Sequence, residues 1–212
     1  MMGKKRSESF KDNVVVLVFG VLFLLSVFLL VGSSIRTTGY ATTSTTTSNV
    51  TISTYFAIDM STNLSQGIQF GTISSLPATN QNATHNYDGV NTTDQGFYTN
   101  ATNGTSMWMN VSVDSNSAVD FCIYGHTLNT STADEILVGN ETYYNDTDTN
   151  VTIPDVGSEV ALTGSYVKSG SNIAAGSANY YRFWLDVPAA TATGVYNNTV
   201  FFEGVATGGA CT

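Results

Sequence analysis

The 212-residue chain has few charged side chains, and basic ones are the scarcest. It contains seven Lys and Arg residues against 16 Asp and Glu residues, which gives a net charge of −9 at pH 7. Charged residues make up 11% of the chain, well below the roughly 25% that is usual in soluble domains. Because nucleic-acid binding requires clustered Lys and Arg side chains, this composition predicts no nucleic-acid partner.

The sequence also lacks the common motifs of enzymes and metal sites. His85 and His126 are the only histidines, and each stands alone among polar residues. No HExxH, GxSxG, CxxC or phosphate-binding glycine loop is present. Residues 146–150 begin like a calcium-binding loop, but Val151 and Gly157 stand where that loop needs Gly and Glu. The sequence therefore predicts a non-enzymatic protein without catalytic residues, metal site or cofactor.

Most of the basic side chains lie near the N-terminus, on either side of a long apolar run. Residues 1–12 contain four of them and Arg36 is a fifth, whereas residues 37–212 hold only Lys168 and Arg182 against 14 acids. Residues 13–35 carry no charge and are mainly Val, Leu and Phe, close to the roughly 20 residues of a membrane-spanning helix. The basic flank predicts that residues 1–12 stay in the cytoplasm and that the rest is exported.

Two interpretations of residues 13–35 stay open. The segment is either a signal-anchor that holds the protein at the membrane or a secretory signal peptide that is removed. The small residues of Gly39-Tyr40-Ala41 have the pattern of a cleavage site. Residues 36–48 are mostly Thr, Ser, Gly and Ala, which predicts a linker ahead of an extracytoplasmic domain at residues 49–212.

The predicted exported part is rich in acceptor sites for N-linked glycans. Twelve of the 19 asparagines stand in the pattern Asn-x-Ser/Thr, against about five expected by chance from the Ser and Thr content. Glycans are bulky and polar, so they must point to solvent and would solubilise a surface that has few charges. The predicted glycosylation sites are Asn49, Asn63, Asn82, Asn91, Asn100, Asn103, Asn110, Asn129, Asn140, Asn145, Asn150 and Asn197.

Cysteine occurs only twice, at Cys122 within an apolar run and at Cys211, the penultimate residue. In an oxidising compartment this pair predicts one disulfide that ties the C-terminus to the body of the domain. The alternatives are a buried free thiol at Cys122 and an intermolecular bond through Cys211.

Beyond residue 48 the apolar residues follow a period of two, which is typical of half-buried β-strands. No segment after residue 36 has a helical period, and residues 76–105, with several sequons and little alternation, are expected to form a loop. The sequence therefore predicts an all-β fold, an antiparallel Ig-like or jelly-roll β-sandwich preceded by one N-terminal transmembrane or signal helix. The expected strands cover residues 50–60, 67–73, 107–114, 119–123, 181–187 and 196–203.

Short motifs near both ends of the domain resemble those of known surface proteins. Residues 180–188, YYRFWLDVP, followed by residues 194–202, GVYNNTVFF, resemble the final hairpin of many exported Ig-like surface domains. Together with residues 68–73, IQFGTI, this layout resembles archaeal cell-surface filament subunits, the thread-like and bundling-pilus proteins. Those proteins are related in fold to bacterial biofilm-fibre proteins of the TasA and camelysin type.

In that family the N-terminal strand of one subunit completes a sheet of the next. The resemblance implies a donated strand within residues 42–58 of this chain, with Val50, Ile52, Phe56 and Ile58 filling a neighbour's groove. The alternative is an ordinary first strand that pairs within its own chain.

The sequence as a whole predicts a heavily N-glycosylated structural protein of the cell surface, part of an envelope, filament or biofilm matrix. Its expected partners are the membrane, through residues 13–35 unless they are cleaved, and other copies of itself or other surface glycoproteins. The alternative function is a membrane-anchored adhesin or carbohydrate-binding module, in which aromatics such as Trp108, Trp184 and Tyr143 stack on sugars. The other possibility for these aromatics is packing within the domain.

Overall fold

The structure of the protein is a computed structural model that describes residues 16–27, 47, 49–87, 103–155 and 157–212. The chain divides into two units, Met1–Thr51 and Ile52–Thr212.

In the first unit, residues 16–27 form a helix with exposed apolar side chains. No helix within the described ranges is both long and apolar enough to cross a membrane. The predicted basic head, the two flanks of the predicted span and, apart from residue 47, the predicted linker lie outside the described residues.

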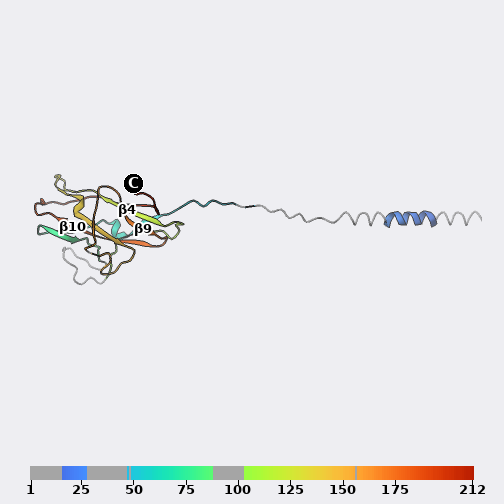
Figure 1. The fold of residues 1–212 in the computed structure, drawn as a ribbon, viewed down its shortest axis with the longest axis horizontal. Helices are drawn as coiled ribbons and strands as arrows, with labels where there is room; N and C mark the ends of the chain where they lie inside the picture. Colours follow the sequence, from blue (N-terminus) through green and yellow to red (C-terminus); the bar gives the residue numbers. More distant parts are fainter. Residues whose placement is uncertain (1–15, 28–46, 48, 88–102, 156) are drawn as a thin grey trace, which may run out of the picture. The chain divides into compact units, whose positions relative to one another are not determined.

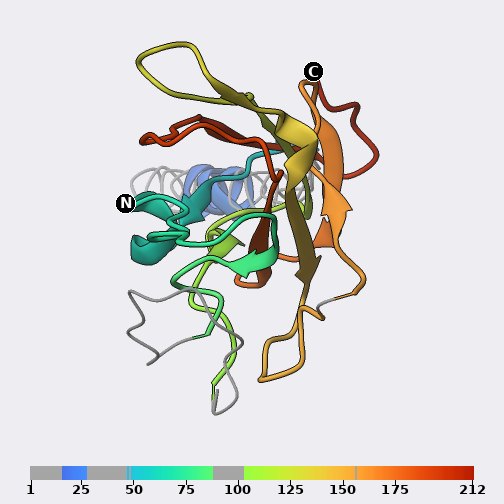
Figure 2. The ribbon, with the colours of Figure 1, turned by 90° about the vertical axis from the view of Figure 1, so that its left-hand side faces the viewer.

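The second unit consists of antiparallel β-sheets, so the predicted all-β fold is confirmed (Figure 1, Figure 2). Among the described residues, the larger sheet has six strands in the order β1-β3-β10-β7-β8, with β2 also paired to β10. The smaller sheet has the order β11-β4-β9, and β5 pairs with β6. The strands are β1 (Ile58–Met60), β2 (Ala78–Asn82), β3 (Trp108–Val111), β4 (Val119–Gly125), β5 (Leu128–Asn129), β6 (Glu135–Ile136), β7 (Glu141–Asp146), β8 (Val160–Ala161), β9 (Val167–Ile173), β10 (Ala178–Val187) and β11 (Val200–Ala206), and two short helices are α2 (Thr62–Ser65) and η2 (Val138–Asn140).

The two main sheets share one apolar core. Side chains of β3 and β10 in the larger sheet pack with side chains of β4 and β9 in the smaller one, and all are nearly inaccessible to solvent. The rings of Tyr181 in β10 and Phe202 in β11 meet edge to face, with centroids 5.3 Å apart. The inward residues are those that the period of two predicts, including Met107, Met109, Val111, Val119, Phe121, Ile123, Tyr181 and Phe183.

The last two long strands lie in different sheets, so the predicted final hairpin is wrong. β10 pairs with β2, β3 and β7, whereas β11 pairs with β4. Residues 188–199 therefore connect one layer to the other. Both strands have the alternation of a half-buried strand, and the pattern alone does not distinguish strands that pair from strands that face each other across a core.

Several predicted strand limits are also wrong. Within residues 50–60 only β1 forms, because side chains of the neighbouring loop take the backbone donors that a strand partner would otherwise bind. Tyr55 N donates to Asn116 Oδ1 at 2.7 Å, and Ala57 N donates to Ser115 Oγ at 3.1 Å. Residues 67–73 form no strand, although Ile68 still packs against the core. The region at 76–105, expected to be loop, contains β2.

Both faces of β10 are buried, although the alternation predicts one polar face. Arg182 and Trp184 point away from the core and are each only 1% exposed. The Arg182 guanidinium donates to the backbone carbonyls of Asn86, Pro154 and Asn150, which places residues 86 and 150–154 over this side of the sheet.

Candidate functional site: the outer face and free edge of the small sheet

A disulfide joins Cys122 in β4 to Cys211, as the cysteine pair predicts. The Cα atoms are 5.8 Å apart, and the two residues are separated by 89 positions in the sequence. Cys122 alternates with Phe121 and Ile123, whose side chains lie in the core, so its sulfur is on the outer face of the small sheet. The bond therefore holds the C-terminal residues against this outer face.

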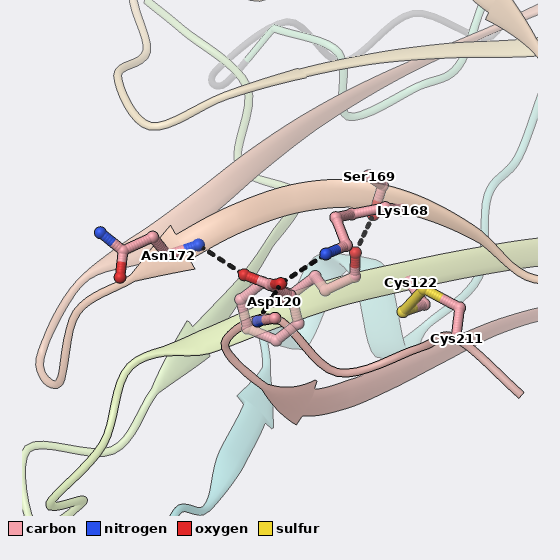
Figure 3. Close-up of polar contacts among 8 residues, drawn as sticks. Asp120, Cys122, Lys168, Ser169, Asn172 and Cys211 are labelled. Carbon is pink, nitrogen blue, oxygen red and sulfur yellow. Dashed lines mark hydrogen bonds and ion pairs between the residues drawn. A yellow bond between two sulfur atoms is a disulfide. The ribbon is translucent and has the colours of Figure 1, made fainter.

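Asp120 lies on the same outer face, two residues before Cys122, and fixes the C-terminal segment from a second point (Figure 3). Its carboxylate accepts hydrogen bonds from Lys168 Nζ at 2.6 Å, from Asn172 N at 2.7 Å and from Gly208 N at 2.9 Å. Asn172 and Gly208 both have positive φ angles, of 56° and 84°, and these turn their N–H groups toward the carboxylate.

The charge state of Asp120 follows from these contacts. Burial of the side chain, which is 2% exposed, raises the pKa of the carboxyl, but the bonds from Lys168, Asn172 and Gly208 outweigh it and lower the pKa below its ordinary value. Asp120 is therefore a carboxylate at neutral pH. We call Asp120, Lys168 and the Cys122–Cys211 disulfide the C-terminal clasp.

Beyond the clasp, the outer face carries a group of aromatic side chains. Tyr124 in β4 and Phe201 in β11 are cross-strand partners with stacked rings, 4.5 Å between centroids and 3° between planes. Tyr166, next to β9, meets Tyr124 edge-on at 4.4 Å, and His126 lies 5.3 Å from Phe201. His126 is exposed and the other three are half-buried. We call these four residues the aromatic ladder.

The inner side of β11 borders an open cleft of about 1040 Å³. Val200 and Phe202 contribute from β11, Leu64 and Phe70 from the segment after β1, and Leu185 from β10. β11 is hydrogen-bonded to β4 on one side and has no strand partner on its other side within the part of the chain that the structure describes. The cleft also has polar lining residues such as Gln69 and Thr193. This edge therefore combines available backbone groups with a cleft that is partly lined by apolar side chains, an arrangement that can accept an added strand.

The segment that precedes β1 is exposed up to Ile52 and docked on the domain from Ser53 onward. Val50 and Ile52 are 84% and 77% exposed, whereas Phe56 and Ile58 pack against the core of their own chain. Asn116 Nδ2 donates to Ser53 O at 2.9 Å, which marks the start of the docked part. The expectation that Phe56 and Ile58 fill a neighbour's groove is therefore wrong, because both side chains are already used in the domain core.

A buried carboxylate stands at the start of β7. Glu141 is 1% exposed, and its Oε2 accepts a hydrogen bond from Asn198 Nδ2 at 2.6 Å. Its Oε1 has no partner among the described residues. Burial raises the pKa of Glu141 from 4.5 to about 7, against the opposing effect of the Asn198 bond. Asn198 belongs to the 188–199 connection that borders the cleft.

The predicted glycosylation sites are not equally accessible. Asn82 is 8% exposed and accepts a hydrogen bond from Asn86 Nδ2 at 3.0 Å, contrary to the expectation that every acceptor side chain points to solvent. Asn91 and Asn100 lie outside the described residues. Asn63, Asn110, Asn140 and Asn145 are partly buried, and the exposed acceptors are Asn49, Asn103, Asn129, Asn150 and Asn197.

The other residues singled out by sequence reasoning do not form a common site. Trp184 and Tyr143 are buried and Trp108 is half-buried, so packing is the role of the first two. In the calcium-like stretch, side-chain oxygens of Asp146 and Asn150 accept hydrogen bonds from backbone N–H groups of their own loop. The aromatic ladder was not predicted from the sequence. Positions 120, 122 and 124 have the same parity, so the alternation that places Phe121 and Ile123 in the core also places Tyr124 on the outer face.

The geometry of this site is the basis for its interpretation. Comparison of the chain with protein-family models, with curated proteins and with solved structures found no match.

Proposed function

We propose that this protein is a non-enzymatic, N-glycosylated structural protein of the cell surface whose copies associate by strand addition at β11. The observation that carries the proposal is the free edge of β11 beside a cleft that Val200, Phe202 and other apolar side chains line in part. The donated strand is the segment up to Ile52, which exposes two large apolar side chains of the same parity. We assign the two packed antiparallel sheets to the Ig-like or jelly-roll type of sandwich, and the edge strand β11 is where a further strand would be added.

Strand periodicity supports this pairing. Alternate residues of an added strand face the same side of the sheet. Val50 and Ile52 would therefore both enter the cleft beside Val200 and Phe202, while Thr51 would face outward. Burying two large aliphatic side chains contributes about 1.5–3 kcal/mol each.

The exported location is supported by the surface chemistry. Five sequon asparagines are exposed on a domain with few charges, and the disulfide is typical of an oxidising compartment. Residues 1–35 would either anchor the protein in the membrane or be removed after export. The alternative function, a carbohydrate-binding module that uses Trp108 or Trp184, is less well supported because Trp184 is buried and Trp108 is half-buried.

Charge substitutions in the exposed segment test the proposal. Val50→Glu combined with Ile52→Glu should abolish filaments or lattice in negative-stain microscopy, because two charges would be placed against the apolar side chains of Val200 and Phe202. Thr47→Glu is the control, because Thr47 has the parity of Thr51: its substitution adds a negative charge on the opposite face, keeps the Asn49-Val50-Thr51 acceptor site and should leave assembly intact. A deletion of residues 42–52 should give a folded monomer, because the docked part begins at Ser53. Assembly that survives both changes would contradict strand addition.

A further inference from the structure

The outer face of β11 aligns a glycan acceptor with the aromatic ladder. Asn198 and Val200 point inward, the first to the buried carboxylate of Glu141, whereas Asn197 is exposed. Because alternate residues of an extended chain share a face, Asn197 and Phe201 are on the same face. Asn197 precedes the start of β11 at Val200 by three residues, and the four residue steps from Asn197 to Phe201 span about 13 Å in extended backbone.

A second acceptor stands directly opposite the first. Asn129 and Asn197 exchange two backbone hydrogen bonds, of 2.9 and 3.0 Å, so their side chains lie on the same face of the sheet. Asn129 Nδ2 donates to Thr127 O at 2.8 Å. The Asn197 side chain makes no hydrogen bond within the described part of the chain, so its amide nitrogen is the freer of the two acceptors.

The aromatic ladder fills the space on this face between the acceptors and the C-terminal clasp. The clasp covers the outer face at positions 120 and 122, and its cover ends before Tyr124, which is half-buried. The ladder thus exposes apolar ring surface, together with polar groups at its rim. His126 is exposed, and the carboxylate of Glu203, two residues from Phe201, is half-buried and already accepts hydrogen bonds from the N–H and hydroxyl of Thr212.

We propose that the aromatic ladder is the contact surface for the oligosaccharide attached to Asn197 of the same chain. A pyranose ring has an apolar C–H face that packs on aromatic rings, and a rim of hydroxyl groups that exchange hydrogen bonds with imidazole, phenol and carboxylate. Attachment at Asn197 gives the sugar a high effective concentration over the ladder, so weak contacts suffice. The proposal rests on the proposed function, because it requires an occupied sequon at Asn197.

The test measures how well the attached sugar is protected. Mild periodate cleaves vicinal diols of most sugars, and glycopeptide mass spectrometry of the native glycoprotein reports its rate at each site. The glycan at Asn197 should react more slowly than the one at exposed Asn103, by about threefold or more, as expected for a ring contact of ordinary strength. Phe201→Thr, which suits a strand, should remove the difference. Tyr55→Ala changes an exposed aromatic outside the ladder and should preserve it.

Three results would overturn the proposal. Equal rates with an occupied Asn197 would refute the contact and leave the glycoprotein proposal standing. An empty Asn197 in native protein would also refute it, and the proposed glycoprotein fails with it only if the other exposed acceptors, Asn49, Asn103, Asn129 and Asn150, are empty too. If the unglycosylated protein dimerises in sedimentation velocity and Phe201→Thr abolishes the dimer, a second copy occupies the ladder instead.

Discussion

The buried carboxylate of Glu141 makes this protein less stable as the pH rises toward neutrality. Burial raises the pKa of Glu141 in the folded state from 4.5 to about 7, so the folded protein binds this proton more tightly than the unfolded chain. The favourable contribution is fully present below about pH 4.5 and is lost as the pH rises to about 7. At about 1.4 kcal/mol for each tenfold change in proton affinity, the loss is about 3 kcal/mol.

Glu141→Gln isolates this effect, because glutamine keeps the shape and the acceptor for Asn198 Nδ2 but does not ionise. At pH 8 the variant should be more stable than the parent protein by about 1–3 kcal/mol, with part of the gain lost to an unpaired amide donor. At pH 4.5 the two proteins should have nearly equal stability. Urea unfolding of the second unit, residues 52–212, followed by Trp fluorescence at both pH values measures the difference.

Glu135→Gln is the matched control, because Glu135 is exposed and its substitution removes the same charge. This control should leave the pH profile of unfolding unchanged. The reasoning is refuted if the difference in stability between Glu141→Gln and the parent protein is the same at pH 8 as at pH 4.5.

Three further predictions concern stability. Replacing both Cys122 and Cys211 with serine should lower the free energy of unfolding, measured in urea, by about 4–5 kcal/mol, because the disulfide closes a long loop. A decrease below about 1 kcal/mol would contradict this. Asp120→Ala should cost about 2–4 kcal/mol in thermal unfolding, because two backbone N–H groups lose their acceptor, whereas Lys168 is partly exposed and regains water. Arg182→Met should lower the free energy of unfolding by a similar amount, about 2–4 kcal/mol, because three backbone carbonyls lose their hydrogen-bond donor. An unchanged melting temperature would contradict this and would show that water takes the place of the guanidinium.

The alternation of apolar residues predicted the inner faces of the sheets well. Phe121 and Ile123 in β4 are core residues, as their parity requires. The same parity places Asp120 and Cys122 on the outer face, where a polar and solvated surface is expected. Both are buried because residues distant in sequence, Lys168 and Cys211, fold over them, and such cover has no local signature.

The candidate site was predictable in part. The two cysteines indicated the disulfide, and the sequons of Asn129 and Asn197 marked exposed positions. Their placement opposite each other depends on a long-range register, and so does the stacking of Tyr124 on Phe201. A period of two reports which face a residue occupies and says nothing about its neighbour across the strand.

The disulfide also decides how the domain responds to a pulling force. Tension applied between residue 52 and the C-terminus runs along the chain to Cys122, crosses the sulfur atoms and leaves through Cys211. The intervening stretch, which contains β7, β9, β10 and β11, stays unloaded. The two cysteines are 89 residues apart, so about 310 Å of chain, at about 3.5 Å per residue, cannot be extended while the disulfide is intact. Only the strands before Cys122 can be drawn out, so the domain acts as a tether with a covalent limit on its extension.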